Sequence, residues 1–346
     1  MATLNKAKKE TQTILKWGGI SLVIIFLFMI GIRFLTLVKD SLTPPPPPQA
    51  SFGKLPPIPF PNQQKENITY SLDTLTGFLP NFSDRAKVYK ITALQPTLLG
   101  LEKTRAKVAA VGFTSSGFQI SEDTYQWLDQ DQPLQRKITM NIFSSDFTLS
   151  SPYLITQSLE EFPGPDEKSR ATEVARSFLS NMSLFPQNID ENKTKTALYS
   201  IEGSALIPTS KIPKTKIVRV DFFQKDLDGL PIYYDKGISS TIDFLVGKEG
   251  RELKVVDARF FNKNISQTSS TYAIKSASQA FSELQKGKAY IAHKPTDTVE
   301  FTIKKVFLGY YIGEDQQEFL MPVIVLEGNN DFVAYVSAVR DEWISN

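Results

Sequence analysis

The sequence lacks cysteine, and its only histidine is His293. Without cysteine the chain has no disulfides, no lipoprotein acylation at cysteine, no thiolate metal ligands and no cysteine nucleophile. One histidine cannot build a multi-histidine metal site, and the G-x-S-x-G motif of a Ser-His-Asp hydrolase is missing. We therefore predict no metal site and no catalytic residue, and we expect His293 to be a loop or surface residue.

Phosphate-binding loops and a broadly basic composition are also missing. Neither G-x-x-x-x-G-K-[ST] nor G-x-G-x-x-G occurs, so no nucleotide cofactor, and no cofactor of any kind, is expected. Of the 39 basic and 37 acidic residues, residues 1–40 hold six and two. The remaining 33 basic and 35 acidic residues give the rest of the chain a net charge of −2. This balance argues against nucleic acid as a partner.

One long apolar run is present, at residues 17–38 (WGGISLVIIFLFMIGIRFLTLV). As a helix it would span roughly 33 Å, enough for a hydrocarbon core of about 30 Å. Its one charge, Arg33, lies near the end, where a long side chain can reach the headgroups. Four lysines precede the run, and the positive-inside rule then places residues 1–16 in the cytoplasm. The sequence predicts a single-pass cell-membrane protein with its C-terminal part extracytoplasmic.

A cleaved signal peptide is the alternative for this run. Its apolar region normally has about 7–15 residues and ends in a small-x-small cleavage site. Here the apolar stretch is longer, and the following KDSLTPPPPP offers no A-x-A motif. We favour an uncleaved anchor in contact with the lipid bilayer.

A proline-rich segment follows, at residues 39–66. Nine of the 21 prolines of the chain lie between Pro44 and Pro61. Such a run adopts polyproline II at about 3.1 Å per residue and is not expected to pack a core. We predict a stalk that holds the outer part away from the bilayer, and a ligand for a proline-binding domain is the alternative.

The outer part is predicted to repeat one order, a helix followed by strands. The clearest helix is 171–182, whose apolar residues recur at i, i+3, i+4, i+7, i+8 and i+11. A second helix is expected at 271–286 and a weaker one at 97–111. The fold class is therefore α+β: one N-terminal transmembrane helix, then helix-plus-antiparallel-meander units. The expected units are 67–160, 161–266 and 267–346.

The strands are rich in β-branched and aromatic residues. The turns expected at 247–250 and 328–331 are short, which favours antiparallel pairing. Pro322 lies inside one of these strands and cannot donate a hydrogen bond, so that strand should be an edge or be bulged there. The predicted strands are 68–72, 87–91, 124–128, 137–149, 217–224, 232–235, 241–246, 253–261, 299–311, 319–327 and 332–338.

Two further patterns bear on function. The segment Asp226–Gly229 faintly matches a calcium loop, but the following residues lack the required glutamate, so we expect a polar turn.

Aromatic residues occur in four adjacent pairs, and in a strand one ring of each pair would face the core and the other would face outward. Four outward rings on one face would form a patch for a protein partner. The pairs are 222–223, 233–234, 260–261 and 310–311.

Segments near the C-terminus resemble a known family. TYAIKSASQAFSELQKG, FTIKKVFLGYY, FLMPVIVLEG and DFVAYVSAV are similar to the C-terminal domain of YycH/YycI-type proteins. The segment Asp228–Ile232 also fits, and more loosely resembles PepSY-like modules. Such proteins are membrane-anchored extracytoplasmic accessory proteins of a cell-wall-sensing histidine kinase, and no catalytic residue carries over from them. The matching elements are Leu284–Gly287, Leu308–Tyr311, Met321–Val323 and Tyr335–Ala338.

The resemblance implies a regulatory interaction module that modulates another membrane or envelope protein of bacteria, such as a sensor kinase. Two alternatives belong to other classes. One is a cell-wall or glycan-active enzyme that uses paired carboxylates, whose spacing is spatial and leaves no local motif. The other is a purely structural envelope protein. A cleft with two carboxylates of perturbed pKa would favour the enzyme.

Overall fold

The computed structural model describes residues 49–345 apart from 65, 93–95, 130–133, 157, 163, 165 and 297. These residues belong to the second of two units into which the chain divides, Met1–Pro47 and Pro48–Asn346. The predicted tail at 1–16, the span at 17–38 and the start of the stalk lie outside the described residues. Within the described part, no helix has the length and apolar character needed to cross a membrane.

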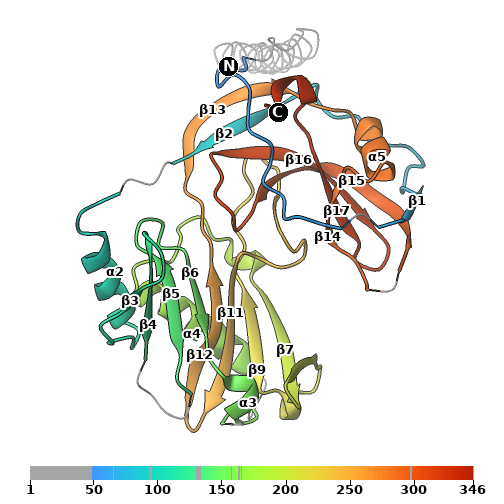
Figure 1. Ribbon diagram of the computed structural model, residues 1–346. Coiled ribbons are helices and arrows are strands. Elements are labelled where there is room, and N and C mark those ends of the chain that lie inside the picture. The colour runs from blue at the N-terminus through green and yellow to red at the C-terminus, as the bar shows by residue number, and fades with distance from the viewer. Residues whose placement is uncertain are drawn as a thin grey trace, which may run out of the picture. The chain divides into compact units, whose positions relative to one another are not determined.

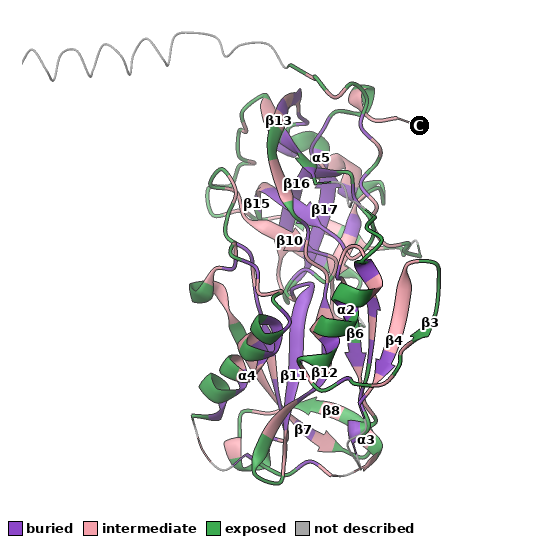
Figure 2. Cartoon of the chain, turned by 90° about the vertical axis from the view of Figure 1, so that its left-hand side faces the viewer, coloured by how far each residue is buried: buried purple, intermediate pink, exposed green. Residues whose placement is uncertain are grey.

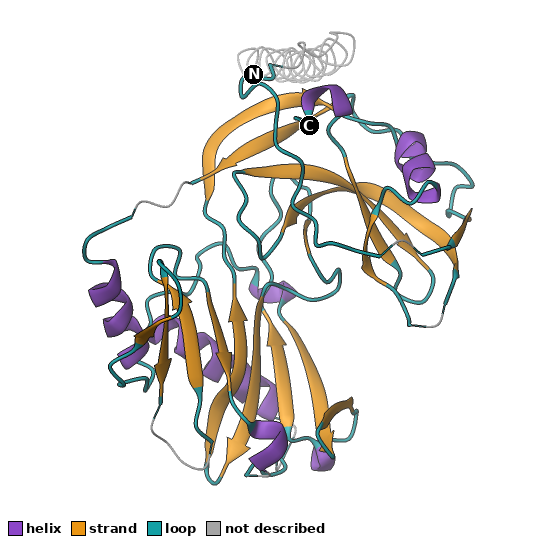
Figure 3. Cartoon of the chain, in the orientation of Figure 1, coloured by secondary structure: helices purple, strands orange, loops and turns teal. Residues whose placement is uncertain are grey.

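Strands form most of the regular structure (Figure 3). Seventeen strands and four α-helices lie in the described residues, and the strands build two large sheets. The predicted α+β fold of repeated helix-plus-meander units is therefore wrong. Periodicity marks single elements, whereas sheet membership depends on pairing between segments that are distant in the sequence.

The first sheet has nine strands, and all its neighbouring pairs are antiparallel (Figure 1). It joins strands of the expected first unit to strands of the second, because Phe147–Leu149 pair with Ala258–Phe260. In spatial order the strands are β3 (Phe118–Gln119), β4 (Thr124–Leu128), β5 (Lys137–Asn141), β6 (Phe147–Ser150), β12 (Glu252–Phe260), β11 (Ile242–Glu249), β9 (Ile217–Asp221), β7 (Lys195–Glu202) and β8 (Ala205–Pro208).

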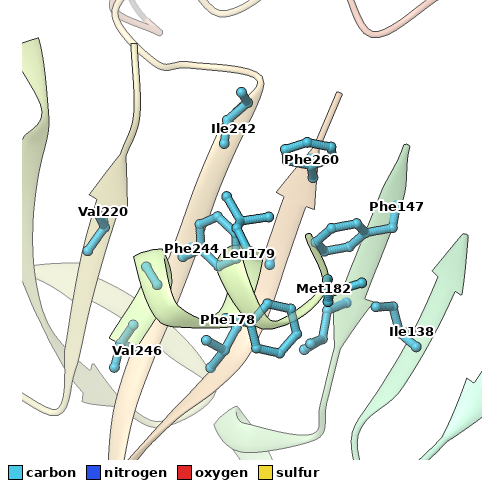
Figure 4. Packing of buried hydrophobic residues seen from close by; sticks show 14 of the residues in the cluster. Ile138, Phe147, Phe178, Leu179, Met182, Val220, Ile242, Phe244, Val246 and Phe260 are labelled. Carbon is cyan, nitrogen blue, oxygen red and sulfur yellow. The ribbon is translucent and has the colours of Figure 1, made fainter. Parts of the chain in front are cut away.

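One face of this sheet is covered by helix α4 (Glu167–Asn181), which confirms the helix predicted at 171–182. Its Phe178 lies edge-on to Phe244 of β11, with ring centroids 6.0 Å apart (Figure 4). β11 is buried over its first six residues (Figure 2). The weaker predicted helix is α2 (Gly100–Ala109), whose Val108 joins the same core. A single turn, α3 (Tyr153–Thr156), follows β6.

The second sheet has eight strands and includes two parallel pairs. The predicted strands 68–72 and 87–91 pack back onto it, as expected, and the C-terminal hairpins are confirmed. Its main path is β1 (Thr69–Leu72), β15 (Glu300–Ile312), β16 (Phe319–Gly328), β17 (Val333–Ser337) and β14 (Tyr290–His293). Off this path, β10 (Ile232–Tyr234) pairs with β15, and β2 (Arg85–Ile91) pairs with both β16 and β13 (Ile265–Ala273).

The helix predicted at 271–286 begins later, as α5 (Ala277–Gln285). Residues Thr271–Ala273 belong to β13 and pair with β2. Ser276 accepts a hydrogen bond from the main-chain nitrogen of Gln279, and the Gln279 side chain accepts one from that of Ser276. This capping box fixes the start of the helix at Ser276. Gly287, at φ +67°, follows its end in the left-handed conformation expected of a C-terminal stop.

The turn predicted at 247–250 lies further along the chain. Gly247 is inside β11, and Glu249 pairs with Glu252 across the turn. A Cβ atom on Gly247 would lie 2.8 Å from the Leu159 side chain. This glycine therefore permits close packing against Leu159 and does not make the turn.

Pro322 lies in β16, which is neither an edge strand nor bulged at that residue. β16 pairs with β2 at Phe319 and Leu320, and with β17 from Val323 onward. Pro322 falls between these two ladders, where the missing N–H breaks no ladder hydrogen bond. The prediction that β16 is an edge strand or is bulged at Pro322 is therefore wrong. The missing N–H of proline nevertheless explains why the pairing changes from one neighbour to the other at this residue.

The described part of the expected stalk is packed against the second sheet. Residues 49–64 are called the strap here. Leu55 is fully buried, Ile58 is buried, and Phe60 stacks on Tyr290 with centroids 5.0 Å apart. Leu55 and Ile58 belong to one buried cluster with residues of β15, β16 and β17, and Phe52 packs against that cluster. The strap is therefore part of the fold and not a free spacer.

Candidate functional site

His293 and the Asp226–Gly229 segment, considered above for catalysis or metal binding, lie in different elements of the fold. His293 is the last residue of β14, is partly buried and pairs with Val333 of β17. Among the described residues, no group of three or more histidine, aspartate or glutamate side chains could hold a metal ion. His293, expected to be a loop or surface residue, is thus a partly exposed residue at the end of a strand.

The polar turn predicted at Asp226–Gly229 is confirmed. Leu227 and Leu230 exchange main-chain hydrogen bonds of 3.0 and 2.9 Å across Asp228 and Gly229. Both intervening residues have positive φ, +53° and +74°, as in a type I′ turn. Asp228 accepts hydrogen bonds from the Tyr89 hydroxyl and, at 3.1 Å, from the Lys87 ammonium. Two side chains of the neighbouring strand β2, Tyr89 and Lys87, therefore hold the turn through Asp228.

The aromatic pairs do not form an outward patch. Tyr310 and Tyr311 are both fully buried, because β15 is covered on both faces. Phe222 is fully buried and Phe223 is partly exposed, and the two rings join different core clusters. The expectation that one ring of each pair faces solvent is therefore wrong at Tyr310 and Tyr311, because both faces of β15 are covered.

A charged cluster lies on the face of the first sheet opposite α4. Asp243 of β11 accepts from Arg259 of β12 at 2.7 Å and lies 3.4 Å from Arg219 of β9. Arg219 also makes two 2.8 Å hydrogen bonds to Asp221. Arg259 reaches Glu314 in the turn between β15 and β16, so this ion pair joins the two sheets.

Asp257 belongs to the same face as this cluster. Burial, followed by the negative charge of Asp243, raises the pKa of Asp257 to about 6. Burial and the Asp257 charge raise the pKa of Tyr153 to about 12. Asp243 forms ion pairs with Arg219 and Arg259, and Asp257 lines none of the five cavities compared in the described residues.

Two cavities meet at the linker between β12 and β13. They share Ser144 and residues 262–264. Their volumes are about 780 and 900 Å³, within the range of ligand sites, and such sites favour the junction between structural units. The first is called the strap cavity and the second the lysine cavity. We take this junction as the candidate site.

The strap cavity has two unlike walls. Pro56, Pro57 and Pro59 of the strap, with Phe319 and Met321 of β16, supply an apolar wall. The other wall carries amides and charges from β2, the β5–β6 loop, the linker and the β15–β16 turn. Its residues are Lys90, Asp146, Asn262, Lys263, Asn264, Gln316, Gln317 and Glu318.

Lys263 lies between the two cavities. Its side chain is 10% exposed, and its ammonium is 3.7 Å from Asp146 and donates to the main-chain oxygen of Glu314 at 3.3 Å. Burial raises the pKa of Asp146, and the positive charge of Lys263 opposes that rise. The pair therefore ties the β5–β6 loop of the first sheet to the β15–β16 turn of the second.

These site residues could not be found from the sequence. They come from segments that are separated by up to 265 positions, from Pro56 to Met321, and form no local motif. Only the prolines of the strap gave a signal, and they were assigned to a stalk.

Comparison with known proteins gives little. No family model matches the chain, and no curated protein matches it. The chain is similar to the crystal structure of an uncharacterized protein from Eubacterium rectale, with a TM-score of 0.34 and 14% identity, over 74% of this chain and 84% of that one. It is also similar to the Bacillus megaterium YpeB C-terminal domain, with a TM-score of 0.32 and 9% identity, over 72% and 95%. The YycH/YycI-type and PepSY-like resemblances stay predictions.

Proposed function

We propose that the chain is a membrane-anchored extracytoplasmic module that modulates another envelope protein by binding one of its extended segments in the strap cavity. The observation that carries this proposal is the wall formed by Pro56, Pro57 and Pro59. The strap follows the apolar run 17–38 in the sequence by only ten residues. A partner bound against these prolines would contact the segment that leads to the anchor.

The chemistry of the cavity fits a peptide. An extended segment presents apolar side chains on one side and main-chain N–H and C=O groups throughout. The prolines, Phe319 and Met321 suit the former, and the amides of Asn262 and Gln316 suit the latter. The apolar wall lies beside the charges of Lys90 and Lys263, as at many protein interfaces with polar rims.

Site-specific crosslinking tests the proposal. The photoreactive residue p-benzoylphenylalanine is placed at Gln316, which is exposed and lines the strap cavity. The matched control carries it at Glu202, an exposed residue of β7 that lines neither cavity. Irradiation of intact native cells should give a discrete adduct with one envelope protein at position 316 and none at 202. Equal adducts at both positions, or none at 316, would reject the proposal.

A carboxylate-dependent enzyme is the weaker alternative. Such an enzyme would need two acids facing one cleft. Asp243 is instead held by Arg219 and Arg259, which leaves Asp257 as the one described acid of this face that is not in such a pair. The binding proposal predicts that His293→Ala and Asp257→Asn leave cellular function intact. Loss of function in a folded Asp257→Asn protein would favour the enzyme.

A further inference from the structure

The lysine cavity has more positive charge than its carboxylates can balance. Four lysines line it, Lys87, Lys107, Lys225 and Lys263, with two acids, Asp226 and Asp228. Asp226 forms an ion pair with Lys193, which lies outside the lining, and Asp228 is held by Tyr89 and Lys87. Lys263 is beside Asp146. Lys107 and Lys225 are the two lining lysines for which no ion pair is found among the described residues.

Lys107 is a partly buried cation. Its ammonium donates a 2.9 Å hydrogen bond to the Ser145 hydroxyl, and no carboxylate among the described residues forms an ion pair with it. Burial, and then the positive charge of Lys103, lowers the pKa of Lys107. An anion in the cavity would restore the interactions that the ammonium loses on leaving water.

Lys225 completes the positive side of the cavity. Its ammonium has only a 3.4 Å contact with the main-chain oxygen of Gln187, while its main-chain nitrogen donates to Asn188 at 2.7 Å. The second of these bonds fixes the backbone of Lys225 against the segment after α4. The Cα atom of Lys225 is therefore held in place at the cavity wall.

Three residues that line the cavity have positive φ angles: Ser145, Ser183 and Asp228, at +62°, +56° and +53°. Asp228 lies in its type I′ turn. Ser183 follows the C-terminus of α4, where the main-chain nitrogen of Leu184 donates to Leu179 at 2.8 Å, as in a Schellman motif. Ser145 lies in the β5–β6 hairpin loop, where its main-chain nitrogen donates to Asn141 at 3.0 Å. These three turns fix the backbone of the cavity wall.

We propose that the lysine cavity binds a small polar ligand that carries a carboxylate or phosphate group. Lys107 and Lys225 supply charge to the anion. The Ser183 hydroxyl and the Asn264 amide are available to the polar remainder of the ligand. This site adjoins the strap cavity, with which it shares Ser144 and residues 262–264, but Lys107 and Lys225 line the lysine cavity alone. Its ligand is a small molecule and not a protein segment, so the inference does not depend on the proposed function.

Calorimetric titration of the full chain in lipid nanodiscs tests the inference. The probes are inorganic phosphate, citrate and, as a neutral polar control, N-acetylglucosamine, all at constant ionic strength. Saturable binding of phosphate alone indicates a phosphate ligand, and saturable binding of citrate alone indicates a carboxylate. Binding of both supports a general anion site. Absence of saturable binding by either anion, or binding of the neutral sugar only, overturns the inference.

The variants locate the binding. Lys107→Met and Lys225→Met should each weaken anion binding at least tenfold, and the double variant should abolish it. Lys211→Met is the matched control, because Lys211 is exposed and lines neither cavity. Unchanged thermal unfolding of each variant shows that the fold is intact. Equal weakening in Lys211→Met, or undiminished binding in the folded double variant, contradicts the proposed site.

Discussion

Leu55 pairs with Ile344 in a parallel β-bridge that joins the first and last described segments of the chain. The Leu55 main-chain nitrogen donates to Trp343 at 2.8 Å, and its carbonyl accepts from Ser345 at 2.7 Å. Nearby, Phe52 lies 5.2 Å from Phe319 between ring centroids. The strap is thus held by main-chain hydrogen bonds as well as by apolar contacts.

Removal of the Leu55 side chain should destabilise the protein. Leu55 is fully buried, so Leu55→Ala loses apolar contacts and leaves a cavity, at a cost of about 2–5 kcal/mol. Chemical unfolding of the full chain, followed by tryptophan fluorescence, measures this cost, and Trp343 lies beside the bridge. The neighbouring exposed Lys54→Ala should change the free energy of unfolding by less than about 0.5 kcal/mol. A similar small effect for Leu55→Ala would mean that the strap does not pack as described.

The packing of the strap shows one limit of sequence reasoning. Proline content predicts an extended segment, but such a segment can still bury apolar side chains, as Leu55 and Ile58 do. Whether such a face finds a partner depends on a groove made elsewhere in the chain. By contrast, the stripe of α4 was predictable, because Ala175, Phe178 and Leu179 are neighbours on one helix turn.

Which strands pair with one another within each sheet was harder to predict from the sequence. The ends of β15 and β16 could be predicted from residue types and the turn at 328–331. The other neighbours of β15 are β1 and β10, which come from distant parts of the sequence, and closing a long connection costs only slightly more than closing a short one. For the same reason Lys107 and Lys225, which are 118 positions apart, carry no signal of a shared cavity.

A buried ion pair in the first sheet gives a second prediction. Arg136 lies 2.5 Å from Asp129, whose side chain is 2% exposed, and also donates to the main-chain oxygen of Val255 at 3.1 Å. Arg136→Met should cost about 3–5 kcal/mol, because Asp129 loses this ion pair in a buried site. Denaturant titration measures the loss.

The double variant of this pair is the control. Asp129→Asn combined with Arg136→Met removes both charges, so it should be more stable than Arg136→Met alone. If the double variant is as unstable as the sum of the two single variants, Arg136 acts through packing on Phe113 and not through the charge of Asp129.

The topology predicted from residues 17–38 gives a third prediction. Protease added to intact cells should remove the described domain and leave the N-terminal tail protected, because the lysines at 6, 8, 9 and 16 favour the cytoplasmic side. Immunoblots with tags at the two ends follow the fragments. Full protection of the C-terminal tag, with rupture of the cells needed for cleavage, would contradict the predicted orientation.

The raised pKa of Asp257 gives a fourth prediction, on the pH dependence of stability. Its pKa is about 6 in the folded protein against a usual value of 3.8, so the folded state binds more protons between these values. The contribution of Asp257 to the free energy of unfolding should therefore fall as the pH rises from about 4 to 6, and stay constant above. Asp257→Asn cannot ionise, so its stability relative to the original protein should increase over this interval.

Thermal unfolding at a series of pH values measures the difference. Glu202→Gln, at an exposed position of β7, should give no such rise. A difference for Asp257→Asn that is independent of pH would show that the carboxyl does not titrate in this range.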